Sequence, residues 1–324
     1  MITEFIPNGT LDIILKLERK GLSNDNWNDT KKLINIYGIA CGMSYLHSHN
    51  YLHRDLKPAN VFLDDYLFPI IGDFGLSKEI AHEKINGKKS GLKGTCAYIA
   101  PEIFNENKYD KSGDVYSFAM IVYEIMTNNI LYENLNHFQV MINVINGFRP
   151  KLSNEIPSCY QKLIEDCWED DPKRRPTFDQ IVEILRNDQE FITETVDKNE
   201  FYEYIEYIEG DVSNIKLAPT VSIDLNLAEE DEDEEVDDNN NNNEVLKKGY
   251  VDLRDFEKVK LIRKSEFSKF YEIKNIKNGL IYFAKFMTIV IAKLKKDEIL
   301  NLTREVNIIS QLNHPCCLQF IGYS

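Results

Sequence analysis

Apolar residues recur at helical spacing through the first two thirds of the chain. Between residues 30 and 48 they fall on one face of a helix, whereas residues 113–127 are apolar nearly all round, which predicts a helix buried at the centre of a fold. A further stripe near residues 201–208 predicts a last helix docked on the same core. The stripes consist of Leu33, Ile36, Tyr37, Ala40, Met43 and Leu46, and of Phe201, Tyr204, Ile205 and Ile208.

Two more helices are indicated by their start and stop signals. Thr10 precedes a helical pattern that Gly21 is expected to end. Thr177 and Gln180 have the spacing of a capping box, in which each side chain bonds the backbone of the other residue. The first two thirds of the chain are therefore predicted to be mainly helical.

Residues 250–324 have a different pattern, in which apolar and polar positions alternate more. Ile281–Met287 follows a turn at Asn278-Gly279 and is predicted to be a strand. Residues 297–312 have helical spacing and carry Glu305. This region is predicted to be a small β-rich domain with one main helix.

An acidic, asparagine-rich stretch separates the two regions. Residues 193–249 contain eighteen Asp and Glu and four Lys and Arg, and because the whole chain has a net charge of −15, the remainder is close to neutral. Like charges repel, and little apolar surface is present to offset chain entropy, so we expect disorder at 210–249. The expected domains are 1–209, this linker, and 250–324. The acidity argues against binding of nucleic acid or anionic membranes.

Length and composition indicate a soluble globular protein of about two domains. The 324 residues are 43% hydrophobic and 28% charged. No run of eighteen apolar residues and no signal-peptide pattern occurs, so neither a membrane span nor secretion is expected. The six cysteines form no C-x-x-C pair and no zinc-finger pattern. We expect reduced, mostly buried thiols and a cytoplasmic location.

Three short motifs occur in a fixed order. Residues 53–60 are HRDLKPAN, Asp73-Phe74-Gly75 follows, and Ala100-Pro101-Glu102 comes next. This set resembles the catalytic loop, the metal loop and the activation-segment end of eukaryotic protein kinases. A lone D-F-G is common by chance, but the complete set in this order is specific. The resemblance implies an α+β kinase fold, here with a mainly helical large lobe followed by a linker and a small β-rich lobe.

The resemblance assigns the chemistry of phosphoryl transfer to four side chains. Asp55 would accept the proton of the acceptor hydroxyl, and Lys57 would contact the transferred phosphate. Asn60 and Asp73 would supply hard oxygen ligands to Mg²⁺. The implied reaction moves the γ-phosphate of ATP to a hydroxyl of a protein substrate.

Two positions favour serine and threonine as the phosphate acceptors. Lys57 stands two residues after Asp55, where tyrosine kinases usually differ, and Thr95 resembles the threonine that hydrogen-bonds both of those side chains. Residues 114–118 and Cys167-Trp168 resemble the tyrosine-kinase-like group of serine/threonine kinases.

Other residues match structural positions of the family. His53 and Phe74 are expected in an internal spine, and ordinary core packing would bury them in the same way. Asp114 resembles the aspartate that anchors the catalytic-loop backbone, which would give a buried carboxylate its partners. Glu102 and Arg175 resemble a buried ion pair of the family, the alternative being a solvated surface pair.

The activation segment would run from Asp73 to Glu102. Arg54, beside the catalytic aspartate, suggests control by phosphate that an upstream kinase adds to this segment. Ser90, which lies among three lysines, is the candidate acceptor. An unmodified, solvated serine is the alternative.

Nucleotide contacts are expected from both ends of the sequence. Residues 3–9 resemble the kinase hinge, so that the Glu4 carbonyl and the Ile6 amide would bond adenine. Lys285 resembles the strand lysine that contacts ATP phosphates, and Glu305 resembles the helix glutamate that pairs with it. An exposed strand lysine is the alternative for Lys285.

The segment before that strand departs from the family pattern. The three positions of the glycine-rich loop are held by Arg263, Ser265 and Ser268. Each adds a Cβ where backbone amides are expected to approach phosphates closely. Weakened or unusual nucleotide binding is the expectation that follows.

Two arrangements would explain a large lobe that precedes a small lobe. In the first, the commoner explanation, the chain is a fragment of a tandem kinase and each lobe lacks its partner. In the second, the small lobe folds back onto the large lobe as a permuted kinase. The linker has an r.m.s. span of about 35 Å, against a radius of gyration of about 16 Å for a lobe of this size, so chain length permits this. The permuted arrangement predicts that Lys285 faces Asp73 across a cleft.

A scaffold without catalytic activity is the alternative of a different class. The missing glycines favour it, whereas the presence of Asp55, Asn60 and Asp73 opposes it.

Overall fold

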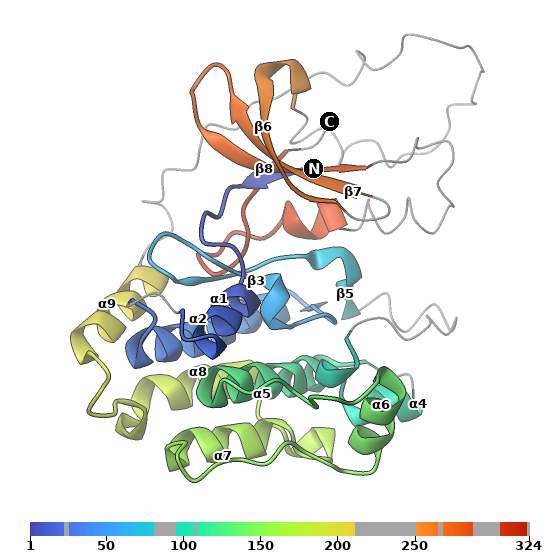
Figure 1. Ribbon diagram of the computed structural model, residues 1–324, viewed down its shortest axis with the longest axis vertical. Coiled ribbons are helices and arrows are strands. Elements are labelled where there is room, and N and C mark those ends of the chain that lie inside the picture. The colour runs from blue at the N-terminus through green and yellow to red at the C-terminus, as the bar shows by residue number, and fades with distance from the viewer. Residues whose placement is uncertain are drawn as a thin grey trace. The chain divides into compact units, whose positions relative to one another are not determined.

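The computed structural model contains two compact units, which are described one at a time (Figure 1). It describes residues 1–22, 26–80, 95–106, 109–210, 251–264, 268–287 and 305–322. One unit, called the helical unit below, contains Pro7–Gly210 and His314–Cys317. The other, called the sheet unit, contains Met1–Ile6 and the described residues from 251 to 313 and from 318 to 322. The predicted α+β class is confirmed.

The units do not follow the predicted division into 1–209 and 250–324. Residues 1–6 pack with the sheet, and residues 314–317 pack with the helices. The predicted linker lies outside the described residues, except for Gly210.

The helical unit is built from helices joined by short strands and 3₁₀ turns. Its α-helices are α1 (Leu11–Arg19), α2 (Asp29–Ser48), α4 (Pro101–Glu106), α5 (Lys111–Thr127), α6 (His137–Ile145), α7 (Ser158–Cys167), α8 (Phe178–Asn187) and α9 (Lys198–Glu209). Its antiparallel strand pairs are β2 (Tyr51–Leu52) with β5 (Lys78–Glu79) and β3 (Val61–Leu63) with β4 (Pro69–Ile71). Its 3₁₀ turns are η1 (Pro58–Asn60), η2 (Phe74–Leu76), η3 (Cys96–Tyr98), η4 (Pro172–Arg174) and η5 (Gln189–Phe191).

Helices α2 and α5 form the centre of this unit. Both are buried along most of their length, which the nearly all-round apolar sequence of α5 predicts, whereas for α2 the sequence predicted only one apolar face. Helix α2 packs against α5, α8, α9 and β4, and α5 also packs against α7. The predicted helices at 30–48 and 113–127 are thus confirmed.

The predicted helix signals are also found. Gly21 lies just beyond α1 with a φ of +66°, the left-handed conformation that favours glycine at a helix end. Thr177 and Gln180 form the predicted capping box at the start of α8. The predicted apolar stripe of α9 is buried.

Two glycines of α2 allow close approach of other segments. A Cβ at Gly38 would lie 2.1 Å from the hydroxyl oxygen of Tyr204 in α9. A Cβ at Gly42 would lie 3.1 Å from the backbone oxygen of Cys316 and 2.7 Å from Cδ1 of Ile71. The Ile71 amide donates to that same Cys316 carbonyl over 2.7 Å. Residues 314–317 therefore dock on α2 and β4 through backbone contacts that a larger side chain would block.

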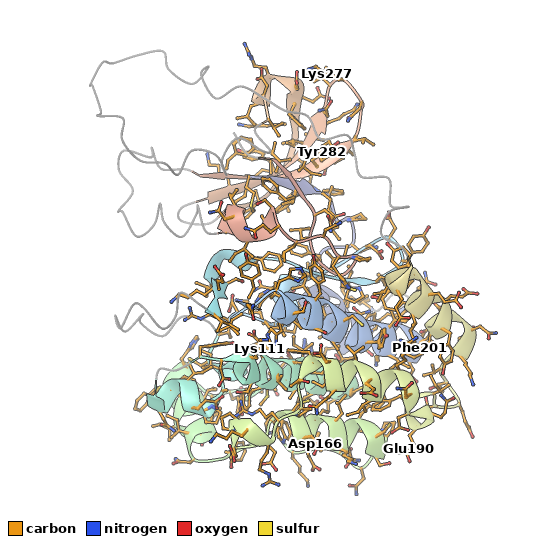
Figure 2. All side chains as sticks on the ribbon, turned by 180° about the vertical axis from the view of Figure 1, so that it is seen from behind. Lys111, Asp166, Glu190, Phe201, Lys277 and Tyr282 are labelled. Atoms are coloured by element: carbon orange, nitrogen blue, oxygen red, sulfur yellow. The ribbon has the colours of Figure 1, made fainter. Side chains whose placement is uncertain are left out.

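The sheet unit takes its strands from both ends of the sequence. Within the described residues, one antiparallel five-stranded sheet has the order β6-β7-β8-β1-β9. The strands are β6 (Phe256–Lys264), β7 (Ser268–Asn275), β8 (Ile281–Met287), β1 (Ile2–Glu4) and β9 (Phe320–Gly322), preceded by the 3₁₀ turn η9 (Leu253–Asp255). The strand predicted at Ile281–Met287 is confirmed as β8. Figure 2 shows Lys277 at the hairpin before it and Tyr282 within it.

Strand β1 lies in the middle of this sheet. Ile2 pairs with Ala284 on one side and with Gly322 on the other. The Lys285 amide donates to the Met1 carbonyl over 2.9 Å. Ile2 is 1% exposed and belongs to an apolar cluster with Val251, Ile273, Tyr282 and Ala284. The first residues of the chain therefore supply both ladder hydrogen bonds and core to this sheet.

The predicted helix at 297–312 is only partly within the described residues. Residues 305–309 are helical and are followed by a turn at 310–311. All six cysteines are free thiols, and all but Cys96 are buried. No helix in the described part of the chain has the length and apolar character needed to span a bilayer.

The docking of residues 314–317 on α2 can be tested at Gly42. We expect Gly42→Ala to lower the free energy of unfolding by about 1–3 kcal/mol, because the added methyl group meets backbone that cannot move aside cheaply. An unhindered glycine-to-alanine change inside a helix would instead stabilise by up to about 1 kcal/mol. Thermal unfolding of the full chain shows whether Gly42→Ala lowers or raises the free energy of unfolding.

Two further measurements make the Gly42 test specific. Ile71→Val removes Cδ1, the nearest flexible atom, and is expected to restore part of the stability in the double variant. Labelling of Cys316 and Cys317 with a thiol reagent is expected to become faster in Gly42→Ala. A stabilised Gly42→Ala variant with unchanged labelling would rule out this docking.

Candidate active site

One buried carboxylate holds the backbone of the loop that carries Asp55. Asp114, near the start of α5, is fully buried and accepts hydrogen bonds from the amides of His53 and Arg54, each over 2.9 Å. Arg54 has a φ of +69°, which is unfavourable for a residue with a side chain. The two bonds keep the loop in this conformation, so the predicted anchoring role of Asp114 is confirmed.

Asp114 has two further partners that the sequence analysis missed. His47 at the end of α2 contacts it through Nε2 over 2.9 Å, and the Tyr109 hydroxyl donates to it over 2.8 Å. Burial alone would raise the pKa of Asp114, but the hydrogen bond and charge of His47 lower it below its usual range. Asp114 is therefore kept ionised. A histidine near the end of an apolar helix was the only sequence signal for His47.

The predicted catalytic side chains lie together on this loop. Lys57 Nζ donates to Asp55 Oδ2 over 2.7 Å. Asn60 Nδ2 donates to the Asp55 carbonyl over 2.7 Å and to Asp55 Oδ2 over 3.0 Å. These bonds orient the Asp55 carboxylate, while the arrangement leaves its second oxygen, Oδ1, without a hydrogen bond in the described part of the chain.

The β3–β4 hairpin brings the Asp73 loop beside Asn60. Val61 pairs with Ile71, and the Gly72 amide donates to the Asn60 carbonyl over 2.9 Å. Asp73 follows at once, exposed and with a φ of +58°. Two residues thirteen positions apart in the sequence therefore become neighbours through backbone pairing.

The side chains of Asn60 and Asp73 suit a hard divalent cation. Asn60 uses only its amide nitrogen in hydrogen bonds, which leaves Oδ1 free, and the Asp73 carboxylate has no partner within the described ranges. Among the described residues, no group of three or more His, Cys, Asp and Glu side chains is placed to hold a metal. A donor set of one carboxylate and one amide fits Mg²⁺, which keeps waters and phosphate oxygens in its shell.

His53 and Phe74 pack together beneath this loop. Their ring centroids are 5.4 Å apart and both residues are buried. His53 Nε2 lies 3.1 Å from the Gly72 carbonyl, and the Ser77 hydroxyl donates to the His53 carbonyl over 3.1 Å. These contacts join the Asp55 loop to the Asp73 loop, as expected of a spine.

The end of the activation segment differs from the prediction for Thr95. Thr95 is exposed, and its side chain forms no hydrogen bond with Asp55 or Lys57, all three residues being described. The reason is local: Lys57 is already paired with Asp55, and Thr95 leads directly into η3 with its side chain in solvent. Ser90 and its neighbouring lysines lie outside the described residues.

An ion pair and a hydrogen bond hold the end of the activation segment in place. Arg175 is bidentate to Glu102, with N–O distances of 2.7 and 2.9 Å, and its side chain is fully buried. The predicted buried pair is thus confirmed over a surface pair. The Tyr98 hydroxyl donates to Glu124 of α5, a contact that the sequence analysis missed. Burial raises the pKa of Glu124 to about 7.

The sheet unit holds the predicted lysine–glutamate pair. Lys285 Nζ lies 2.9 Å from both carboxylate oxygens of Glu305, whose side chain is 5% exposed. A solvated strand lysine is therefore excluded. The remaining predicted nucleotide residues also lie in this unit. The Glu4 side chain accepts from the Gln319 amide over 2.7 Å, and the Ile6 amide makes no hydrogen bond in the described part of the chain.

The positions of the missing glycines fall at the β6–β7 hairpin. Arg263 pairs with Phe270 in the ladder, and Ser268 begins β7. Both positions lie in strands, a conformation that does not require glycine. Ser265 lies outside the described residues.

Comparison with known proteins agrees with this geometry. The sequence model of the family described as "Protein tyrosine and serine/threonine kinase" matches residues 1–185, which is more than half of the chain. The match covers Asp55, Asn60, Asp73 and Asp114, and it does not extend to Lys285.

Three relatives illustrate the likeness. The chain is 35% identical over 196 residues to a probable LIM domain-containing serine/threonine-protein kinase of Dictyostelium discoideum, which covers 59% of this chain and 19% of the relative. It is 32% identical over 187 residues to serine/threonine-protein kinase STY17 of Arabidopsis thaliana, covering 57% and 31%. It is 37% identical over 190 residues to ankyrin repeat and protein kinase domain-containing protein 1 of Mus musculus, covering 55% and 25%.

The chain thus spans less than a third of the length of these relatives. The family match, the Asp55–Lys57–Asn60 arrangement and the anchoring by Asp114 agree with one another. The chain belongs to the protein tyrosine and serine/threonine kinase family.

Proposed function

We propose that this chain is a protein serine/threonine kinase that transfers the γ-phosphate of ATP to hydroxyl groups of protein substrates. The arrangement of Asp55, Lys57 and Asn60 on a backbone held by Asp114 carries this proposal. Asp55 would orient the acceptor hydroxyl and take its proton, and Lys57 would neutralise charge on the transferred phosphate. The printed names of the relatives support serine and threonine as acceptors.

Asn60 Oδ1 and the Asp73 carboxylate would hold Mg²⁺. The bound cation supplies charge that neutralises the phosphate oxygens of ATP during transfer. Because Asn60 is held through its amide nitrogen, its Oδ1 can bind the cation without a change in the side-chain conformation.

Residues of the sheet unit would hold the nucleotide. Glu305 keeps the Lys285 ammonium in place for the phosphates of ATP. Removing one partner of an ion pair this buried would destabilise the fold by several kcal/mol. The Glu4 carbonyl and the Ile6 amide are proposed to bond adenine, as in a kinase hinge.

We further propose that the chain forms one permuted kinase domain. The position of β1 between β8 and β9 supports this arrangement over a tandem fragment with two half domains. A facing pair of Lys285 and Asp73 remains a prediction of this proposal.

Location and partners complete the proposal. Free, mostly buried thiols support the cytoplasmic location proposed from the sequence. ATP, protein substrates and an upstream kinase acting on Ser90 are the proposed partners, and neither nucleic acid nor a membrane is among them.

A scaffold that binds partners without catalysis is the second candidate. The absence of glycine at the three loop positions favours it, because each added Cβ would hinder the close approach of backbone amides to phosphates. The hydrogen bond between Lys57 and Asp55 argues against the scaffold, because a protein without catalysis would not require it.

Phosphate incorporation into a serine/threonine peptide tests catalysis. Asp55→Asn is expected to lower the rate by at least about a hundredfold, because the acceptor hydroxyl loses its base. Asp65→Asn, an exposed acid on the same unit, is the matched control and is expected to retain the rate.

Nucleotide binding separates the two candidates. Thermal stabilisation by Mg-ATP that disappears in Asp73→Ala indicates the proposed site. Absence of both stabilisation and incorporation in the unmodified chain would favour the scaffold.

A cross-strand disulfide tests the permuted arrangement. Ile2 and Ala284 are paired in the ladder at a spacing that suits a disulfide, so Ile2→Cys with Ala284→Cys is expected to form a link within one chain under mild oxidation. Mass spectrometry of peptides identifies the link, and Ile2→Cys with Ile281→Cys is the mismatched control, since Ile281 pairs with Lys274. A link only between two chains, or none at all, would contradict pairing of β1 within its own chain.

A further inference from the structure

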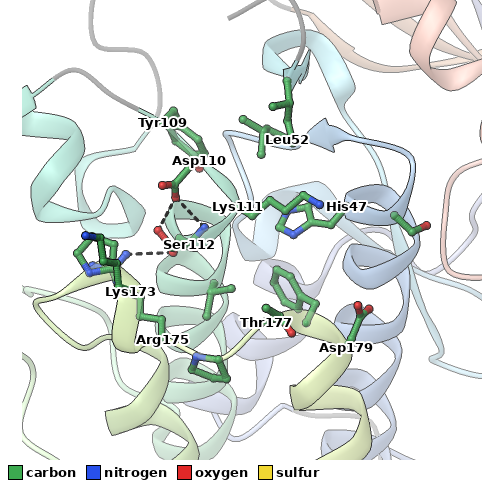
Figure 3. A pocket seen from close by; sticks show the side chains of 16 residues that line it. His47, Leu52, Tyr109, Asp110, Lys111, Ser112, Lys173, Arg175, Thr177 and Asp179 are labelled. Atoms are coloured by element: carbon green, nitrogen blue, oxygen red, sulfur yellow. Dashed lines mark hydrogen bonds between the residues drawn. The ribbon is translucent and has the colours of Figure 1, made fainter. Parts of the chain in front are cut away.

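A cavity of about 500 Å³ lies in the helical unit where α2 ends and α5 and α8 begin (Figure 3). This volume falls in the range of sites for small organic molecules. Its lining includes the apolar side chains of Leu52, Val115, Pro172, Pro176 and Phe178. The cavity therefore offers an apolar interior to a ligand of modest size.

Two lysines whose ammonium groups have no ion pair with any described residue line this cavity. Lys111 and Lys173 line it and are exposed, and neither ammonium group has a hydrogen bond or ion pair with any described residue. Two carboxylates also line the cavity and keep their charge, but each is held by a donor of its own: Asp110 accepts from the Ser112 amide over 2.9 Å, and Asp179 accepts from the Ser44 hydroxyl. An anionic group on a ligand would find two free partners here.

A buried histidine also lines the cavity with one ring nitrogen unused. His47 is 6% exposed, and its Nε2 lies 2.9 Å from the ionised Asp114, which can only accept. Nε2 therefore donates, and Nδ1 has no partner among the residues that the structure describes. Figure 3 shows His47 among the side chains around the cavity.

The same histidine leads directly to the catalytic loop. His47 Nε2 donates to Oδ2 of Asp114, and the His53 amide donates to the same oxygen. The Arg54 amide donates to Oδ1. A ligand that moves the His47 ring would change the hydrogen bonds that hold the loop bearing Asp55.

We propose that this cavity binds a small organic anion with an apolar body, such as an aryl-alkyl carboxylate, and that its occupant acts on the catalytic loop through His47 and Asp114. The carboxylate would pair with Lys111 and Lys173, and the apolar body would lie against Pro172 and Pro176, which are partly exposed. Binding itself does not depend on the proposed kinase activity; only the consequence for catalysis rests on it.

The binding test uses 4-phenylbutyrate with the full chain and isothermal titration calorimetry. Lys111→Ala with Lys173→Ala is expected to weaken binding at least tenfold, and raised salt is expected to weaken it as well. Lys151→Ala with Lys162→Ala, two exposed lysines elsewhere on the unit, is the matched control. The neutral 4-phenylbutan-1-ol is expected to bind more weakly and to be insensitive to both pairs of changes. Equal affinity of acid and alcohol, or no binding of the acid, would overturn the site.

The link to the catalytic loop has its own readout. In a chain with ¹⁵N-labelled histidine, 4-phenylbutyrate is expected to shift the Nδ1 resonance of His47 and to leave that of His137, exposed on α6, unchanged. Lysine-dependent binding without any change at His47 would overturn the proposed coupling. Neither measurement requires phosphate transfer, so failure here is distinct from failure of the proposed kinase function.

Discussion

The buried carboxylate of Asp114 is the interaction on which the catalytic part of the helical unit depends. It accepts from two loop amides, a hydroxyl and an imidazole, so a charge that would be costly in the core is fully compensated. Because these donors come from α2, the Asp55 loop and the segment before α5, the carboxylate joins three segments. A loop residue with positive φ persists only where the surrounding contacts over-determine it, and Arg54 is such a residue.

The chemistry placed on this support needs few protein groups. Asp55 is oriented by Lys57 and Asn60, and Asn60 in turn keeps one oxygen free near the Asp73 loop. Phosphoryl transfer depends on positioning and charge neutralisation rather than on covalent steps by the protein. A small set of side chains on a rigid backbone is therefore sufficient, and most of the helical unit serves to hold that backbone.

Each unit is completed by a segment distant in sequence. In the helical unit, residues 314–317 lie against α2 because Gly42 has no side chain to obstruct the Cys316 backbone. In the sheet unit, residues 1–6 provide the strand between β8 and β9. Both contacts are made largely by backbone atoms, whose hydrogen bonds must be satisfied once water is excluded.

Local sequence patterns were enough to predict the motif-bearing loops, the helices α2 and α5, the capping box of α8 and the pairing of Glu102 with Arg175. Each rests on a local pattern or on residue types with one demanding chemistry. Four features could be seen only in the folded chain: the place of β1 in the sheet, the docking of residues 314–317, the hydrogen bond of His47 to Asp114 and the exposure of Thr95. These depend on backbone pairing and close approach between segments far apart in the chain, which no local periodicity encodes.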